Sequence, residues 1–86
     1  MSWRVRLRIL PRAGLLDPQG QAIEHALSAL RFTGVSGVHV GKAISLELEA
    51  PSREAAEQRA REMCDRLLAN PVTEDYEIQV EPLEGS

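Results

Sequence analysis

Residues 3–10 read WRVRLRIL, in which apolar residues alternate with arginine. Successive side chains of a β-strand point to opposite faces of the sheet, so every second residue shares a face. One face here is apolar and the other is basic: Trp3, Val5, Leu7 and Ile9 against Arg4, Arg6 and Arg8. The stretch therefore predicts a half-buried strand, which Pro11 and Gly14 bring to an end.

A helix is predicted after this strand. Asp17 is a favoured N-cap residue, and Pro18 suits the first helical position, where its missing N–H costs nothing. The apolar residues that follow recur at helical spacing and form one stripe: Ile23, Ala26, Leu27 and Leu30. Gly34 stands about where a helix C-cap is expected.

A second helix is predicted between Ser52, as its N-cap, and Asn70-Pro71, which stops it. Its buried stripe is predicted from four apolar residues: Ala56, Ala60, Met63 and Leu67. Cys64 falls within this pattern, and we interpret it as a small half-buried hydrophobe in preference to a reactive thiol.

The middle segment, residues 38–50, reads VHVGKAISLELEA and leaves three arrangements open. Its apolar residues are all even-numbered: Val38, Val40, Ile44, Leu46 and Leu48. A two-residue hairpin at Gly41-Lys42 would send the last three to the face opposite the first two. A three-residue loop over 41–43, or one long strand bent at Gly41, would keep all five on one face, so the tight hairpin is the least favoured arrangement.

A last strand is predicted where three apolar residues alternate with polar ones: Tyr76, Ile78 and Val80 with Glu77, Gln79 and Glu81. The order β-α-β-(β)-α-β predicts an α+β fold, a ferredoxin-like two-layer sandwich with two helices on one face of an antiparallel sheet. With the first strand central, its arginines would face Glu47 and Glu49 on one side and Glu77 and Glu81 on the other. We expect a single domain over residues 1–86, ordered from about 2 to 82, with a short C-terminal tail that frays.

Composition excludes several classes of function. The net charge of −3 and the three aromatic residues argue against nucleic-acid binding. One cysteine and two histidines cannot form a zinc cage, and no metal or cofactor site is predicted. No run of about 20 apolar residues and no signal peptide is present, so we expect no membrane association and a cytoplasmic location.

Catalytic patterns are absent from the sequence as well. His25 and His39 have no partner at a diagnostic spacing, so both are interpreted as surface or structural residues. Three polar clusters at element ends remain: Asp17 to Gly20, Gly41-Lys42, and LLANPVTEDY at 67–76. Each has a local explanation, but Gly20 costs up to about 1 kcal/mol against alanine in a helix. Close approach of its backbone to another surface would explain why glycine stands there. For the three clusters, a role in docking and a purely local structural role remain equally favoured.

These clusters resemble the PurS family, the small subunit of phosphoribosylformylglycinamidine synthase. Three segments carry the resemblance: LLDPQGQAIEHAL (15–27), VSGVHVGKAISLEL (35–48) and MCDRLLANPVTEDYEIQVE (63–81). With the first strand they span nearly the whole chain in the family's order and spacing. The resemblance implies a chain without a catalytic site that bridges a glutaminase subunit and a synthetase subunit and supports ammonia transfer between them. The assembled enzyme uses ATP, magnesium and glutamine to convert formylglycinamide ribonucleotide into the formylglycinamidine in purine biosynthesis.

The interface and scaffold residues implied by the resemblance and by the three clusters are Asp17, Pro18, Gln19, Gly20, Gly41, Lys42, Asn70, Pro71, Glu74 and Tyr76. Dimers of the family share strands, so we expect a homodimer or larger oligomer with Gly41 as the bend between two sheets. The alternative from another class is a ferredoxin-like regulatory module that binds a small ligand, with Lys42 and the arginines as anion contacts.

Overall fold

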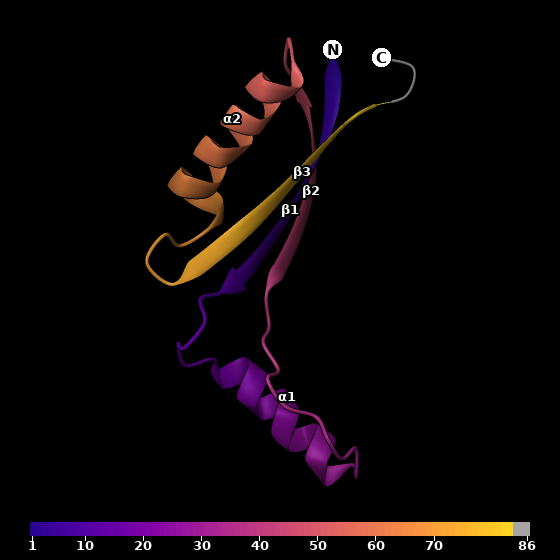
Figure 1. The fold of residues 1–86 in the computed structure, drawn as a ribbon, viewed down its shortest axis with the longest axis vertical. Helices are drawn as coiled ribbons and strands as arrows, with labels where there is room; N and C mark the ends of the chain where they lie inside the picture. Colours follow the sequence, from indigo (N-terminus) through magenta and orange to yellow (C-terminus); the bar gives the residue numbers. More distant parts are fainter. Residues whose placement is uncertain (84–86) are drawn as a thin grey trace.

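The computed structural model describes residues 1–83 as a three-stranded antiparallel sheet with helices, in the order β-α-β-α-β. The strands are β1 (Ser2–Pro11), β2 (Lys42–Glu49) and β3 (Glu74–Pro82), and the helices are α1 (Pro18–Ala29) and α2 (Arg53–Met63). One π-helical turn, η1 (Cys64–Leu68), continues α2. β1 lies between β2 and β3 (Figure 1), so the α+β class and the central first strand are confirmed.

The strand register places the apolar side chains of all three strands on one face. Leu7 pairs with Ile44 of β2 and with Ile78 of β3. α2 packs against β3 and β1, and its alanines Ala56 and Ala60 are fully buried there. The apolar residues predicted for β1 are all buried: Trp3, Val5, Leu7 and Ile9. This face is the hydrophobic core of the chain.

The opposite face carries the predicted pairing of arginines with glutamates. The pairs are Arg4–Glu47 at 3.9 Å, Arg6–Glu81 at 3.2 Å and Arg8–Glu77 at 3.8 Å. Glu49 differs from the prediction, because its carboxylate lies 3.8 Å from the N-terminal amine of Met1 and accepts a hydrogen bond from the Ser2 hydroxyl. The basic residues of β1 are thus matched by acidic residues within the chain.

The end of α1 corrects the predicted C-cap. The helix ends at Ala29, five residues before Gly34, because Arg31 adopts the left-handed conformation with φ of 71°. The N–H of Arg31 donates to the Ser28 carbonyl and that of Phe32 to the Leu27 carbonyl. These two bonds form a Schellman motif with arginine at the position that glycine usually takes. Gly34 lies in the turn that follows.

The buried stripe of the second helix also differs at its C-terminal end. Leu67 is 81% exposed, whereas Cys64 is fully buried and Leu68 packs against the core. The Ala69 N–H donates to the Cys64 carbonyl at 3.0 Å, one residue further than in an α-helix. This wider turn carries one extra residue, so Leu67 faces outward and Leu68 faces the sheet.

The middle segment is not a hairpin. Residues 42–49 pair with β1, and residues 38–41 continue from β2 away from the sheet to α1 (Figure 1). The structure comes nearest to the third arrangement but differs from it, because residues 38–41 are not a strand: β2 begins at Lys42, and the segment leaves the sheet at Gly41. A Cβ at Gly41 would overlap the Ile9 carbonyl oxygen, so the two backbones meet at a distance only glycine allows.

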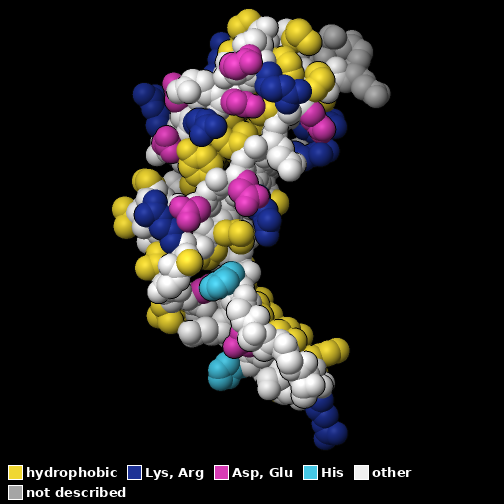
Figure 2. Space-filling model, in the orientation of Figure 1, with side chains coloured by type: hydrophobic (Ala, Val, Ile, Leu, Met, Phe, Trp, Pro, Cys, Tyr) yellow, Lys and Arg dark blue, Asp and Glu magenta, His cyan; other side chains and the backbone are white. Residues whose placement is uncertain are grey.

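The molecule is elongated because α1 lies beyond the end of the sheet (Figure 1). Its extents are 50 × 29 × 15 Å and its radius of gyration is 16.6 Å, against about 12 Å for a compact domain of this length. We call α1 and the loop that follows it the α1 arm. On the face shown in Figure 2, charged side chains are frequent over the sheet and α2 but sparse along this arm. Apolar side chains of the arm are exposed, including Ile23, Leu30 and Phe32.

The predicted fraying of the C-terminal tail falls on residues 84–86, which lie outside the described residues. Before them, Pro82 ends β3, and the Leu83 N–H donates to the Ser2 carbonyl at 3.1 Å. Within residues 1–83, no helix has the length and hydrophobicity that a membrane span requires.

Candidate functional site

Most of the predicted interface residues lie in or beside two clusters, which also contain residues that were not predicted. One is the α1 joint, defined here as Asp17, Gly20, His39, Val40 and Gly41, where α1 meets the segment that leads into β2. The other is the sheet-end cluster, defined as Arg12, Lys42, Asn70, Pro71 and Glu74, at the end of the sheet nearest α1. Tyr76 is placed apart from both, beside η1.

Asp17 holds the α1 joint together. Its side chain is only 10% exposed. Oδ1 accepts the Gly20 N–H at 3.1 Å, and Oδ2 accepts the Val40 N–H at 2.9 Å. The bond from Val40, followed by that from Gly20, lowers the pKa of Asp17 below its ordinary value of 3.8, and His39 adds to this effect with Nδ1 3.4 Å from Oδ2. The predicted N-cap is therefore also a cross-link between α1 and the middle segment.

A close contact within the chain explains why residue 20 is a glycine. It is buried, and a Cβ there would overlap the Val38 carbonyl oxygen and press on the Asp17 carboxylate. The close backbone approach expected from the sequence is thus made to Val38 of the same chain. Pro18 and Gln19 are exposed beside it, so their assignment to an interface stays a prediction.

Glu74 organises the sheet-end cluster. Its Oε1 accepts the Asn70 N–H at 2.7 Å and lies 4.0 Å from Lys42 Nζ. Lys42 Nζ also donates to the Leu68 carbonyl at 3.3 Å, at the end of η1. The Asn70 side chain accepts the Val72 N–H at 2.9 Å, which fixes the turn after Pro71. The start of β2, the end of η1 and the start of β3 are joined by this cluster.

Arg12 was not predicted, yet it ties the loop after β1 to the loop before β3. Its N–H donates to the Thr73 carbonyl at 2.9 Å, its guanidinium donates to the Pro71 carbonyl at 2.6 Å, and Nε lies 3.2 Å from Asp75. Sequence reasoning had no signal for this role, because an arginine in a loop shows nothing about partners 59 residues away.

Tyr76 and Asp65 form a further pair that the sequence did not indicate. The Tyr76 hydroxyl donates to Asp65 Oδ1 at 3.0 Å, and this bond raises the pKa of Tyr76. The adjacent Cys64 packs as a small hydrophobe, as predicted, although it is fully and not half buried. Burial raises the pKa of its thiol, which disfavours the reactive thiolate form.

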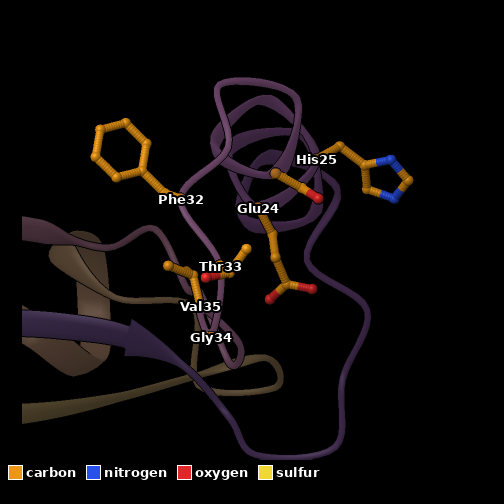
Figure 3. Close-up of a pocket in the computed structure, with 7 residues that line it drawn as sticks. Glu24, His25, Phe32, Thr33, Gly34 and Val35 are labelled. Carbon is orange, nitrogen blue, oxygen red and sulfur yellow. The ribbon is translucent and has the colours of Figure 1, made fainter.

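A hollow of about 420 Å³ lies at the tip of the arm, between α1 and the loop that follows it (Figure 3). Glu24 extends toward this loop, and its carboxylate accepts the Val38 N–H at 3.4 Å. His25 points outward, away from Glu24 (Figure 3). The hollow therefore does not bring an acid and a base together.

Across residues 1–83, no group of three or more His, Cys, Asp or Glu side chains is arranged to hold a metal ion. The arginines and the lysine that an anion-binding module would use are already paired with glutamates.

Comparison with known proteins identifies the family. The family model PurS, phosphoribosylformylglycinamidine (FGAM) synthase, matches residues 4–82. This chain belongs to the PurS family. A PurS subunit from a Synechocystis species is 44% identical over 85 residues, which cover 99% of this chain and 85% of that protein. The predicted family is confirmed.

Two solved structures have the same fold. Methanocaldococcus jannaschii PurS, described as a subunit of formylglycinamide ribonucleotide amidotransferase in the purine biosynthetic pathway, matches with a TM-score of 0.84 at 38% identity, covering 95% of this chain and 99% of that one. A chain in the structure of PurLQS from Thermotoga maritima matches with a TM-score of 0.85 at 32% identity, covering 94% and 99%. These matches support the ferredoxin-like class predicted for this PurS chain.

Proposed function

We propose that this PurS chain is the small, non-catalytic subunit of FGAM synthase, and that it bridges the glutaminase and synthetase subunits and supports ammonia transfer between them. The assembled enzyme is a carbon–nitrogen ligase of purine biosynthesis that uses glutamine as amide donor and acts in the cytoplasm. The observation that carries this proposal is the likeness to a chain of the Thermotoga PurLQS structure over 94% of the present chain.

The side chains of the described residues agree with a role in assembly. His25 faces outward, His39 lies against Asp17, and Cys64 is buried. A nucleophile with an adjacent base is the minimum for covalent catalysis, and these residues do not form such a pair. We assign ATP and magnesium to the synthetase subunit and no cofactor to this chain.

We further propose that the chain acts as a homodimer, in which α1 of one copy packs on the sheet of the other. α2 packs against β3 and β1, whereas Ile44, Leu46 and Leu48 of β2 are only partly buried on the same face. A groove of about 410 Å³ lies beside them and is lined by Leu46, Met63, Leu67 and Leu68 with Arg59, Glu62 and Arg66. A ferredoxin-like sandwich needs a second helix at this place.

The α1 arm has the properties of that helix. Its apolar residues Ile23 and Leu30 are exposed, and it stands clear of its own sheet. Exchange of an element between copies is an economical route to a dimer. Light scattering of the purified chain at micromolar concentration is expected to give the mass of a dimer, and a monomeric mass would contradict this arrangement.

Reconstituted activity tests the bridging function. The two larger subunits should form FGAM from glutamine only when this chain is present, whereas activity with added ammonia should persist without it, because free ammonia needs no glutaminase. An equal glutamine-dependent rate with and without the chain would refute the proposal. Turnover by the purified chain alone would refute its non-catalytic character.

A further inference from the structure

Two passages of chain connect the α1 arm to the sheet (Figure 1). The first stem, residues 12–16, follows β1, and the second stem, residues 38–41, leads into β2. α2 packs against the sheet, whereas α1 lies beyond its end (Figure 1). The direction of the arm is therefore set where the two stems leave the sheet.

Arg12 anchors the first stem to the loop before β3, residues 69–73, which we call the base loop. Its backbone N–H donates to the Thr73 carbonyl at 2.9 Å, and its Nη2 donates to the Pro71 carbonyl at 2.6 Å. Nε of the same guanidinium lies 3.2 Å from the Asp75 carboxylate, just beyond the loop. Two separate nitrogens of a planar fork are engaged, and the single ammonium of a lysine cannot reproduce that geometry.

Lys42 anchors the second stem to both ends of the same loop. It is the first residue of β2 and directly follows the stem. Its Nζ donates to the Leu68 carbonyl at 3.3 Å, immediately before the base loop, and lies 4.0 Å from Glu74, immediately after the loop. The Glu74 carboxylate in turn accepts the Asn70 N–H at 2.7 Å.

The base loop has a fixed shape, because Asn70 accepts three backbone hydrogen bonds. Its carbonyl accepts the N–H groups of Thr73 at 3.2 Å and Glu74 at 2.8 Å, and its side chain accepts the Val72 N–H at 2.9 Å. A loop closed in this way can hold both stems at one spacing.

We propose that the base loop clamps both stems and thereby fixes the direction in which the α1 arm leaves the sheet. Arg12 and Lys42 are the two positioning residues of this clamp. The exposed apolar side chains of the arm, Ile23 and Leu30, are then presented in one direction. A surface positioned in advance loses less conformational entropy on binding. Unlike the proposed dimer, the clamp is a property of a single chain.

Single-molecule fluorescence energy transfer within one chain tests the clamp. Dyes attached at S36C, on the arm, and at Q58C, on α2, report the distance from the arm to the sheet. Both positions are exposed, and the native Cys64 is buried and stays unlabelled. At sub-nanomolar concentration each chain is observed singly, so the outcome does not depend on dimer formation.

The clamp variant is R12A/K42A, and its matched control is R31A/R61A. The control removes the same charge from two exposed arginines outside the clamp. Trp3 is buried at the opposite end of β1 from Arg12, so its fluorescence in the unlabelled variants checks that the sheet is folded. If the double variant does not fold, R12A and K42A alone carry the same comparison.

We expect one narrow distance distribution in the wild type and in R31A/R61A. In R12A/K42A the fraction of molecules outside this distribution should rise about fivefold, a modest change because the clamp contacts are exposed to solvent. K42R keeps a cation and should behave as the wild type, whereas R12K should resemble R12A because one ammonium cannot serve both acceptors. An unchanged distribution in R12A/K42A, or equal broadening in R31A/R61A, would overturn the inference.

Discussion

Asp17 Oδ2 accepts the backbone N–H of Val40 at 2.9 Å, across 23 residues of sequence. With the bond from Gly20 to Oδ1 at 3.1 Å, this contact links the start of α1 to the segment that enters β2. The arm is thereby held at a defined angle to the sheet. The proposed dimer, in which α1 packs on the sheet of another copy, needs such a fixed base.

Replacing Asp17 with alanine should loosen this joint without unfolding the sheet. The Gly20 and Val40 amides lose their acceptor, so both should exchange with solvent faster in hydrogen-exchange NMR, whereas the amides of Val5 and Leu7 in the central strand should keep their protection. Replacement of the exposed Gln58 with alanine is the control. Unchanged exchange at Val40 in D17A would contradict the role of Asp17.

Acid should release the same joint. The folded-state pKa of Asp17 lies below its ordinary value of 3.8, so the unfolded chain takes up the proton first as pH falls. The stability that Asp17 contributes is therefore fully present above about pH 4 and is lost as pH drops through the lower folded-state pKa. Melting temperature followed against pH should show this loss in the wild type and a shallower fall in D17A. Parallel curves for the two proteins would show that the carboxylate is not linked to stability.

Alanine substitutions at Gly20 and at Gln19 should distinguish a structural role from a role in docking. An alanine Cβ at Gly20 overlaps the backbone oxygen of Val38, which cannot rotate away. Overpacking of this kind costs about 1–3 kcal/mol, more than the gain in helix propensity of about 1 kcal/mol, so G20A should be less stable in urea unfolding. The exposed Gln19 should tolerate alanine with the stability unchanged. A stable G20A would mean that the joint is loose.

The Gln19→Ala variant also tests the interface assignment. Its binding to the larger subunits should fall if the side chain docks. Wild-type affinity in Q19A would remove Gln19 from the interface while leaving the role of Gly20 intact.

The π-turn predicts opposite results for two adjacent leucines. Leu68 packs against the core and Leu67 is 81% exposed. Because Leu68 is only partly buried, L68A should lower the free energy of unfolding by about 1–2 kcal/mol, below the cost of about 2–5 kcal/mol at a fully buried site. L67A should change the free energy of unfolding of the isolated fold by less than about 0.5 kcal/mol. The two variants are compared at a protein concentration at which the proposed dimer forms to the same extent in each. A larger loss of unfolding free energy in L67A than in L68A would indicate a regular α-helix through residue 68.

Elements with a local cause could be predicted from the sequence. The alternation in residues 3–10 and 76–81 fixed which side chains are buried, and Asp17-Pro18 and Ser52 fixed two helix starts. The C-terminal ends of the helices were predicted less well. Arginine takes the left-handed position at residue 31, and the extra residue of η1 reverses the sides of Leu67 and Leu68. Neither feature can be read from the spacing of apolar residues in the sequence.

The candidate site was also predicted only in part, because some of its contacts join residues that are distant in the sequence. The clusters at Asp17–Gly20, Gly41-Lys42 and Asn70–Tyr76 stand out by residue type, and the structure brings Lys42, Asn70 and Glu74 together. Arg12, His39 and Asp65 act through partners distant in sequence, which no local pattern reveals. The exposed position of α1 also depends on where Gly41 directs the chain, and sequence spacing does not determine that direction.

Sedimentation of the mixed subunits tests whether this chain joins the glutaminase to the synthetase. The glutaminase and the synthetase are mixed with ATP, magnesium and glutamine, and the mixture is centrifuged with and without this PurS chain. We expect a single species containing all three proteins when the chain is present, and separate glutaminase and synthetase when it is absent. Co-sedimentation of the two larger subunits in its absence, to the same extent, would contradict a bridging role.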